Sequence, residues 1–186
     1  MKLLKVPYFW QLDNPSGNGD IECYSSTCAM LAADKGKVQT DDEYCRLRER
    51  FGYTTDQIAQ IKTLEYLGLK VTARKDGCLN HIHRLISDNT PVAVGWLHKG
   101  YVSQPMAGGH WSVIAGYTEY ETIHLDPFAE ADMVWGGYVN YNRGKEIKYS
   151  NLNWLRRWMV EGEGTGWYSC TVIEDFFSCD ALVTHL

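Results

Sequence analysis

The sequence predicts an α+β fold with a helical N-terminal half and an antiparallel β-sheet in its C-terminal half. Between residues 23 and 87, apolar residues recur at helical spacing, and capping residues or glycines bound the segments. From residue 91 onward the apolar runs shorten to strand length, and polar turns separate them. Helices followed by antiparallel strands define the α+β class.

Length and composition are those of one soluble domain that spans residues 1–186. Hydrophobic residues make up 45% of the chain and charged residues 22%, which is ordinary for a globular protein. The net charge of −5 argues against nucleic acid as a partner. No apolar run approaches the ~18–20 residues that span a bilayer, and Met1–Pro7 is too short in apolar residues for a signal peptide. We therefore expect cytoplasmic synthesis without membrane insertion, and the oligomeric state is left open.

The N-terminal half begins with residues 1–22, whose prolines and glycines predict an extended segment and a loop. A buried helix is expected at or just after Cys23, ending at Gly36. The pair Thr40 and Glu43 fits a capping box for a second helix that ends at Gly52. A third helix starts at Thr55. Its expected apolar stripe consists of Ile58, Ile61, Leu64, Tyr66 and Leu67.

A short strand and a fourth helix are expected to complete the helical half before residue 91, and strands with one further helix are expected after it. The helix at 151–160 should pack through Leu152, Leu155, Trp158 and Met159. The remaining segment from 127 to 148 is rich in glycine and aromatic residues and predicts loop with short strands. The predicted elements are a strand at 69–73, a helix at 78–87, a strand at 91–97, a loop at 98–109, the helix at 151–160, and strands at 167–173 and 181–185.

A hairpin organises the predicted site. The apolar run that opens at His110 is followed by the polar turn 118–121 and by a second strand that ends at Asp126. Antiparallel pairing places the first residue of one strand beside the last residue of the other. His110 and Asp126 should therefore lie side by side, as a general base and the carboxylate that orients it.

The candidate nucleophile is Cys23. A cysteine at a helix N-terminus is exposed to the partial positive charge of the helix and to unpaired N–H groups, which favour the thiolate. A neighbouring imidazole adds to this effect and later protonates the leaving amine. The chain order is then Cys23, His110, Asp126.

Other cysteines and histidines are expected to be structural. The sequence has six cysteines and no CxxC pair, so mostly reduced thiols are expected, and Cys28 is assigned to the core. His81 and His83 lie two apart on a predicted helix and face away from each other, so they should not share a metal. His124 points to the same face as Asp126 and could be an accessory site residue, although a satisfied strand histidine is the expected role. No cofactor and no metal are expected.

Two further segments have a structural and a functional interpretation. The aromatic residues Trp135, Tyr138 and Tyr141 could line a substrate groove, although packing of the loop over the core is the expected role. The acidic run Glu161-Gly162-Glu163 is most simply a solvated turn.

A family resemblance adds to this interpretation. The matching stretches are Val6–Asn14, Cys23 with Ser26, Ala29 and Met30 behind it, Gly109-His110-Trp111, Val113-Ile114, Gly116-Tyr117 and Asp126-Pro127. Together they resemble the C39-like branch of the papain-fold cysteine peptidases along roughly residues 6–160. The late helix with Trp154 or Trp158 fits the same pattern. No ATP-binding or membrane-spanning region follows, so a stand-alone domain is expected.

The resemblance implies a papain-like fold and assigns the site residues. Cys23 would be the nucleophile, His110 the general base and acid, and Asp126 the orienting residue. Gln11 would donate its amide to the oxyanion together with the Cys23 backbone N–H. The chain departs from the family at Tyr24-Ser25-Ser26, where glycine or tryptophan followed by proline and threonine is usual, and in the glycine-rich segment 15–22.

The expected function is hydrolysis of amide bonds through a Cys23 thioester. The substrate would be a protein, a peptide, or the stem peptide of peptidoglycan, the last as in cell-wall hydrolases and lysins of bacteria and phages. Two alternatives stay open. A transpeptidase or acyltransferase would use the same thioester, and a non-catalytic binding or structural protein would explain the altered Tyr24-Ser25-Ser26 stretch.

Overall fold

The computed structural model describes residues 1–142 and 144–171. It contains a helical half and an antiparallel sheet, so the α+β prediction is confirmed in outline. The predicted strand at 181–185 and the last two residues of the one at 167–173 lie outside the described residues. None of the helices described is both long and apolar enough to cross a membrane.

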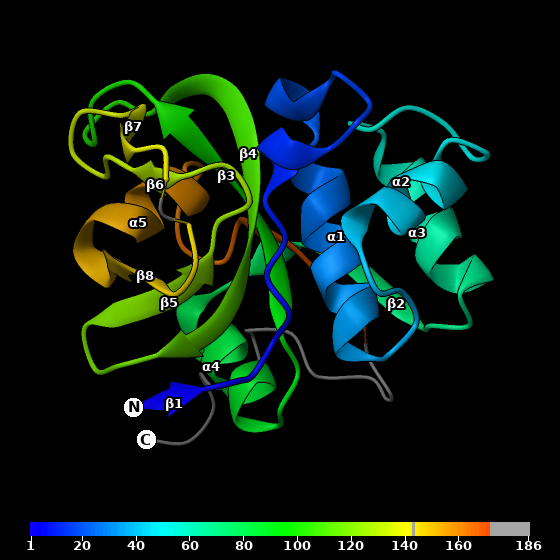
Figure 1. The fold of residues 1–186 in the computed structure, drawn as a ribbon. Coiled ribbons are helices and arrows are strands. Elements are labelled where there is room, and N and C mark those ends of the chain that lie inside the picture. Colours follow the sequence, from blue (N-terminus) through cyan, green and yellow to red (C-terminus); the bar gives the residue numbers. More distant parts are fainter. Residues whose placement is uncertain (143, 172–186) are drawn as a thin grey trace.

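Helix α1 (Cys23–Asp34) is the centre of the helical half. Its residues from Tyr24 to Ala32 are all buried, because the helix contacts α2 (Asp41–Arg48) and α3 (Gln57–Tyr66) on one side and the sheet on the other. Figure 1 shows α1 between β4 and these two helices. The small residues that predict a buried helix therefore permit close packing around its whole circumference.

Helix α2 begins as its capping pair predicts, because Thr40 Oγ1 accepts a hydrogen bond from the Glu43 backbone N–H at 3.2 Å. The helix ends at Arg48, and turns continue to Gly52, whose φ of +151° suits glycine. The predicted stripe of α3 is wrong in part. Ile58 and Tyr66 are exposed. The residues that α3 buries are Ala59, Gln60, Thr63 and Leu64.

Gln60 explains this rotation of α3. Its side-chain nitrogen donates to Ser25 Oγ at 2.9 Å and to the Thr54 carbonyl at 2.6 Å. Its Oε1 accepts from the Tyr44 hydroxyl at 3.0 Å. The buried amide is satisfied in this orientation, and the small neighbours Ala59 and Thr63 allow α3 to approach α1 and α2.

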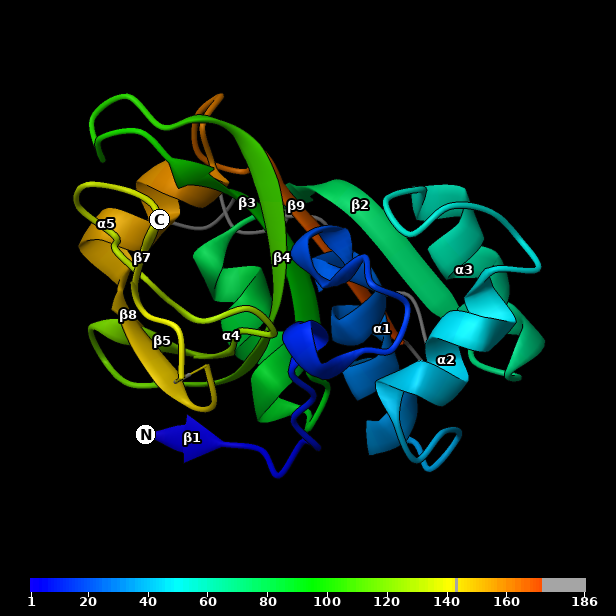
Figure 2. The same cartoon turned by 45° about the horizontal axis from the view of Figure 1, so that its top comes forward.

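The main sheet has the order β2-β9-β3-β4-β5-β8, with β1 paired to β4, and its pairings are antiparallel. Figure 2 shows β9 between β2 and β3. A second sheet pairs β6 with β7. The strands are β1 (Lys2–Leu3), β2 (Val71–Gly77), β3 (Val92–Lys99), β4 (Met106–Tyr117), β5 (Glu121–Leu125), β6 (Glu130–Ala131), β7 (Tyr138–Asn140), β8 (Ile147–Ser150) and β9 (Gly166–Thr171).

Strand β4 corrects the predicted loop at 98–109. It starts at Met106, four residues before His110, because Met106 pairs with Lys99 and Gly109 pairs with Leu97 across an irregularity in β3. The glycines at 108 and 109 therefore belong to the strand. His110 therefore lies within β4 and is not the first residue of the strand.

The remaining helices pack on the sheet. Helix α4 (Leu79–Ser87) starts after Cys78, which is its N-cap, and α5 (Asn151–Trp158) contacts β3 and β8. Trp154 and Trp158 stack with ring centroids 4.8 Å apart in the largest core cluster. The prediction that Leu152 packs inward is wrong, since its side chain is exposed. The two tryptophans fill the space under α5 instead.

Candidate active site

Cys23 is the first residue of α1, directly after the N-cap Glu22. Cys23, Cys28, Cys45 and Cys170 are free thiols, and of these Cys23 alone is partly exposed. Burial raises the pKa of Cys45 and of Cys170 to about 12 and that of Cys28 well above its usual value. Cys28 therefore lies in the core, as predicted.

His110 and Asp126 meet at the open end of the hairpin formed by β4 and β5, where Asp126 follows the last residue of β5. His110 Nε2 lies 2.8 Å from Asp126 Oδ1, and the two side chains are 3% and 0% exposed. The pairing of β4 with β5 shifts between Ile114 and Gly116. This shift determines which residues of the two strands lie opposite each other toward His110 and Asp126. The structure thus places the two residues side by side.

The charge state of His110 is set by its neighbours. Burial alone lowers the pKa of this imidazole, but the charge of Asp126, the hydrogen bond to Asp126, and the adjacent Cys23 together raise the pKa to about 10. Because Nε2 is engaged by Asp126, Nδ1 is the nitrogen left to exchange a proton with Cys23. The three residues therefore form one electrostatically coupled group.

Asp126 is held by several donors besides His110. Oδ1 also accepts the backbone N–H groups of Phe128 at 3.0 Å and Ala129 at 3.3 Å. Oδ2 accepts the hydroxyl of Tyr149, a buried residue of β8, at 3.2 Å. The Tyr149 hydroxyl in turn accepts the N–H of Ala131 at 2.9 Å, so its single proton is directed to Asp126. The sequence did not indicate this role of Tyr149, because a long loop separates β8 from Asp126 and the pairing of β8 cannot be predicted across it.

Aromatic side chains surround the His110 ring. Trp96 meets it edge-on with ring centroids 5.2 Å apart, Tyr138 lies at 5.9 Å, and His98 at 5.6 Å. Burial and the proximity of His110 lower the pKa of His98 to about 4, so His98 is neutral. Its Nδ1–H donates to the Gly108 carbonyl. These rings exclude water from the imidazole.

His124 has the structural role that the sequence predicts. It is fully buried, and burial lowers its pKa to about 3. Its Nδ1 contacts Ser112 Oγ at 2.9 Å, and its Nε2 contacts Thr122 Oγ1 at 3.0 Å. Ser112 also accepts the Trp96 indole N–H at 3.0 Å. His124 therefore supports the tryptophan beside His110 through a hydroxyl.

Gln11 lies in a short 3-10 helix (Gln11–Asp13) and is fully buried. Its backbone N–H donates to the Pro127 carbonyl at 2.9 Å, which joins the N-terminal segment to the loop after Asp126. Its side-chain nitrogen donates to the Gly19 carbonyl. Within the described residues no hydrogen bond joins this amide to Cys23.

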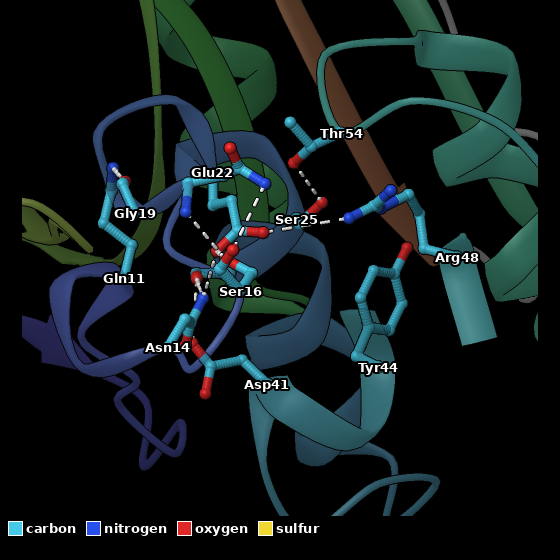
Figure 3. A network of polar contacts seen from close by, with 12 residues as sticks. Gln11, Asn14, Ser16, Gly19, Glu22, Ser25, Asp41, Tyr44, Arg48 and Thr54 are labelled. Carbon is cyan, nitrogen blue, oxygen red and sulfur yellow. Dashed lines mark hydrogen bonds and ion pairs between the residues drawn. The ribbon is translucent and has the colours of Figure 1, made fainter. Parts of the chain in front are cut away.

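Glu22, the residue before Cys23, is buried in a polar network (Figure 3). One carboxylate oxygen accepts from Asn14 Nδ2 at 2.8 Å and from Ser16 Oγ at 2.9 Å. The other lies 3.9 Å from Arg48 Nη2. Both the glycine-rich loop and α2 are thereby attached to the residue that begins α1, which fixes the position of Cys23.

The side chains of the unusual stretch Tyr24-Ser25-Ser26 have partners outside α1. Tyr24 stacks on Trp111, the residue after His110, with ring centroids 3.8 Å apart. Ser25 Oγ contacts Thr54 Oγ1 at 2.8 Å, and Ser26 Oγ donates to Asp41 Oδ2 at 2.8 Å. These three side chains therefore connect α1 to α2, to the turn that contains Thr54, and to β4.

No group of three or more histidine, cysteine or acidic side chains suited to a metal ion is found among residues 1–142 and 144–171. His81 packs edge-on against Tyr168, whereas His83 stacks on Tyr117. The two histidines therefore have different neighbours, as their spacing predicts.

Comparison with known proteins identifies the fold class. No protein-family model matches the chain, and no curated protein matches it in sequence. Solved structures do match, and they show that the chain has the fold of C39-like peptidase domains. A protein from Bacillus anthracis described as a C39-like peptidase aligns with a TM-score of 0.65 at 12% identity, covering 95% of this chain and 100% of that one.

Two other solved structures align over most of their length. A double glycine motif protease from an AMS/PCAT transporter, in complex with its leader peptide, has a TM-score of 0.54 at 16% identity and covers 92% of this chain and 95% of that one. The peptidase domain of Streptococcus ComA, an ABC transporter in a quorum-sensing pathway, has a TM-score of 0.51 at 14% identity, with coverages of 91% and 95%. At these identities the likeness concerns the fold.

Proposed function

We propose that the protein is a cysteine peptidase that cleaves amide bonds of peptides through Cys23, His110 and Asp126. The contact between His110 Nε2 and Asp126 Oδ1 carries this proposal, because it leaves Nδ1 for the half-buried thiol at the start of α1. The other free thiols are buried. A papain-like arrangement of the site belongs to the same proposal.

The proposed reaction has two stages. His110 takes the thiol proton, and the Cys23 sulfur attacks the substrate carbonyl carbon to form a C–S bond. The C–N bond then breaks, and His110 gives its proton to the leaving amine. In the second stage water transfers a proton to His110 and attacks the thioester, which releases the acid and the thiol. Asp126 keeps the imidazole oriented throughout.

The oxyanion of each tetrahedral intermediate needs donors. The first backbone N–H groups of a helix have no partner within it, so the Cys23 N–H is assigned to this role. A primary amide has two N–H groups, and Gln11 uses one on Gly19. We assign the second to the oxyanion, where such a donor contributes about 3 kcal/mol.

Two structural neighbours support a peptide substrate, since one was solved with a leader peptide and both are named as proteases or peptidases. A cell-wall stem peptide stays a prediction from the sequence, as does transfer of the acyl group to an amine. The altered Tyr24-Ser25-Ser26 stretch has a structural explanation that does not require a non-catalytic protein, because its side chains contact Trp111 of β4, Thr54 and Asp41 of α2.

Alkylation of the thiols tests the proposal. Intact protein is treated with iodoacetamide between pH 5 and 8, and each cysteine is followed by mass spectrometry. We expect selective labelling of Cys23 in mildly acidic buffer and at least a tenfold loss of its rate in His110→Ala. His83→Ala is the matched control, because His83 stacks on Tyr117 outside the site. Peptide cleavage should be lost in Cys23→Ala.

Two results would contradict the proposal. Cys23 could react no faster than Cys28, Cys45 and Cys170, or its rate could be the same in His110→Ala as in the wild type. Either result would make a non-catalytic binding protein on this scaffold the better interpretation.

A further inference from the structure

Within the described residues, three tyrosines lie near Asp126. Burial and then the charge of this carboxylate raise the pKa of the hydroxyls of Tyr8, Tyr138 and Tyr149, so each phenol keeps its proton at neutral pH. Tyr8 donates this proton to the Asp126 main-chain carbonyl at 3.0 Å, and Tyr149 donates to Asp126 Oδ2 at 3.2 Å. The Tyr138 hydroxyl has no hydrogen bond to residues 1–142 or 144–171, so its proton is available to another acceptor.

The Tyr138 ring is held against the candidate catalytic histidine. It meets His110 edge-on with ring centroids 5.9 Å apart, and it packs on Phe128 at 4.4 Å and on His98 at 5.5 Å. The side chain is nevertheless partly exposed. The packing of the ring, which the sequence predicts, therefore leaves a functional role open to the hydroxyl.

The turn before Tyr138 explains how the ring reaches this place. Gly136 and Gly137 have φ values of +81° and +79°, which glycine adopts without strain. A methyl group at Gly136 would lie 2.5 Å from the Gly100 carbonyl oxygen. The N–H of Gly137 donates to the His98 carbonyl at 2.7 Å. The turn is thus attached to the end of β3, and Tyr138 follows it directly.

The reactive cysteine distinguishes Tyr138 from the other two tyrosines. After burial and Asp126, the charge of Cys23 also raises the pKa of Tyr138. Cys23 is not among the causes of the raised pKa at Tyr8 or Tyr149. Tyr138 is therefore the tyrosine of the three that lies near both the carboxylate and the sulfur.

The two sides of the bond to be cleaved have different partners. The oxyanion is assigned to donors of the helical half and of the N-terminal segment, the Cys23 N–H and Gln11. The leaving amine receives its proton from His110. Tyr138 packs on His110, and in the described part of the chain no hydrogen bond or ring contact joins it to Gln11 or α1. Its hydroxyl is thereby placed on the side on which the amine departs.

We propose that Tyr138 is a further catalytic residue, whose hydroxyl donates a hydrogen bond to the first main-chain carbonyl of the leaving peptide. This inference rests on the proposed function, because the proton given by His110 defines the leaving side. Every residue of a peptide carries a main-chain carbonyl, whatever its side chain, so the contact is independent of sequence. It holds the departing nitrogen in position to be protonated by His110.

Transfer of an acyl group to added amines tests the inference on the intact protein and needs no natural substrate. N-acetylglycine p-nitrophenyl ester first acylates Cys23: a C–S bond forms, the C–O bond breaks to release p-nitrophenolate, and the thiol proton passes through His110 to solvent. An added amine then forms a C–N bond, the C–S bond breaks, and the amine proton passes through His110 to the sulfur. The amine enters on the side from which a leaving amine departs. Glycinamide carries a carbonyl at the proposed position, and n-propylamine does not.

The measured quantity is the ratio of the two amide products, glycinamide over n-propylamine, determined by mass spectrometry. We expect this ratio to fall about three- to tenfold in Tyr138→Phe, which corresponds to the loss of one hydrogen bond. Phenylalanine keeps the ring packing, so the iodoacetamide rate of Cys23 should equal that of the wild type. The different basicities of the amines cancel when the two proteins are compared. Tyr101→Phe is the matched control, because Tyr101 is 47% exposed and its ring contacts Trp135.

The outcomes separate this inference from the proposed function. An unchanged ratio in Tyr138→Phe, or an equal fall in Tyr101→Phe, overturns the role of Tyr138 even when iodoacetamide labels Cys23 selectively. A wild type that transfers no acyl group to glycinamide overturns it as well, because a site that holds the leaving amine holds the entering one by the same contacts. Failure of the selective labelling of Cys23 overturns the proposed function itself.

Discussion

At the scale of single residues, Asp126 is the most heavily coordinated group of the site. Its two oxygens accept hydrogen bonds from His110, from two backbone N–H groups and from Tyr149. A buried carboxylate with this many donors is fixed in direction. Among the described residues, Tyr149 is the side chain besides His110 that sets this direction, so we assign it as a positioning residue.

Tyr149→Phe should lower kcat about tenfold and leave KM unchanged, because a hydrogen bond to a charged group contributes about 1.5–3 kcal/mol and phenylalanine keeps the ring packing. Steady-state kinetics on a cleaved peptide measure both constants.

Tyr44→Phe is the control for this variant. Tyr44 is buried and donates to Gln60 Oε1 at 3.0 Å, so it loses a comparable bond far from Asp126. A purely structural role for Tyr149 would lower the melting temperature of both variants alike and leave the kcat of Tyr149→Phe equal to that of Tyr44→Phe.

At the scale of elements, α5 holds two loops through a single residue. Arg157 is fully buried. Its guanidinium donates to the carbonyls of Leu97, Lys99, Gly100, Met133 and Val134. These carbonyls lie at the end of β3 and in the segment after β6. The helix thereby fixes the end of β3 and the segment after β6 relative to each other.

Arg157→Lys should destabilise the protein by roughly 2–5 kcal/mol, because an ammonium cannot present the planar fork and several buried carbonyls lose their donors. Urea unfolding measures the change. Arg156→Lys is the matched control, since its neighbour Arg156 is exposed, and it should stay within about 0.5 kcal/mol of the wild type. Equal effects of the two variants would contradict the assigned role.

Element boundaries also show what the sequence could not reveal. The start of α2 follows from its local cap, Thr40. The orientation of α3 does not follow from its apolar residues, because the buried amide of Gln60 determines which side faces inward. Likewise, β4 starts before His110 because residues 106–109 pair with β3. The sequence pattern within one segment does not show which strand the segment will pair with.

At the scale of the whole molecule, the coupling of His110 to Asp126 makes stability depend on pH. The pKa of His110 is raised from 6.5 to about 10 in the folded protein. Its contribution to stability is therefore fully present below about pH 6.5 and is lost as the pH rises through about 10.

The difference in unfolding free energy between the wild type and His110→Gln should shrink from pH 6.5 to pH 10. Urea unfolding at several pH values measures it, and titrations common to both proteins cancel in the difference. A difference that stays constant over this range would show that the imidazole is not held in its charged form.

Part of the candidate site could be predicted from the sequence because two of its residues lie close together along the chain. His110 and Asp126 belong to one hairpin, so a turn and two apolar runs suffice to pair them. Cys23 was found through its place at a helix start. The positions of Tyr149 and His98 depend on contacts between strands that are distant along the chain, which periodicity within a segment does not encode.

The position of β9 has a consequence for the order in which the chain can fold during synthesis. β9 lies between β2 and β3. In the described part of the chain β2 joins the sheet through β9, so it cannot be attached until residues 166–171 have left the ribosome. Until then β3 is paired with β4 on one side, and its other edge is open to pairing with another chain. β9 closes this edge and joins β2 to the sheet.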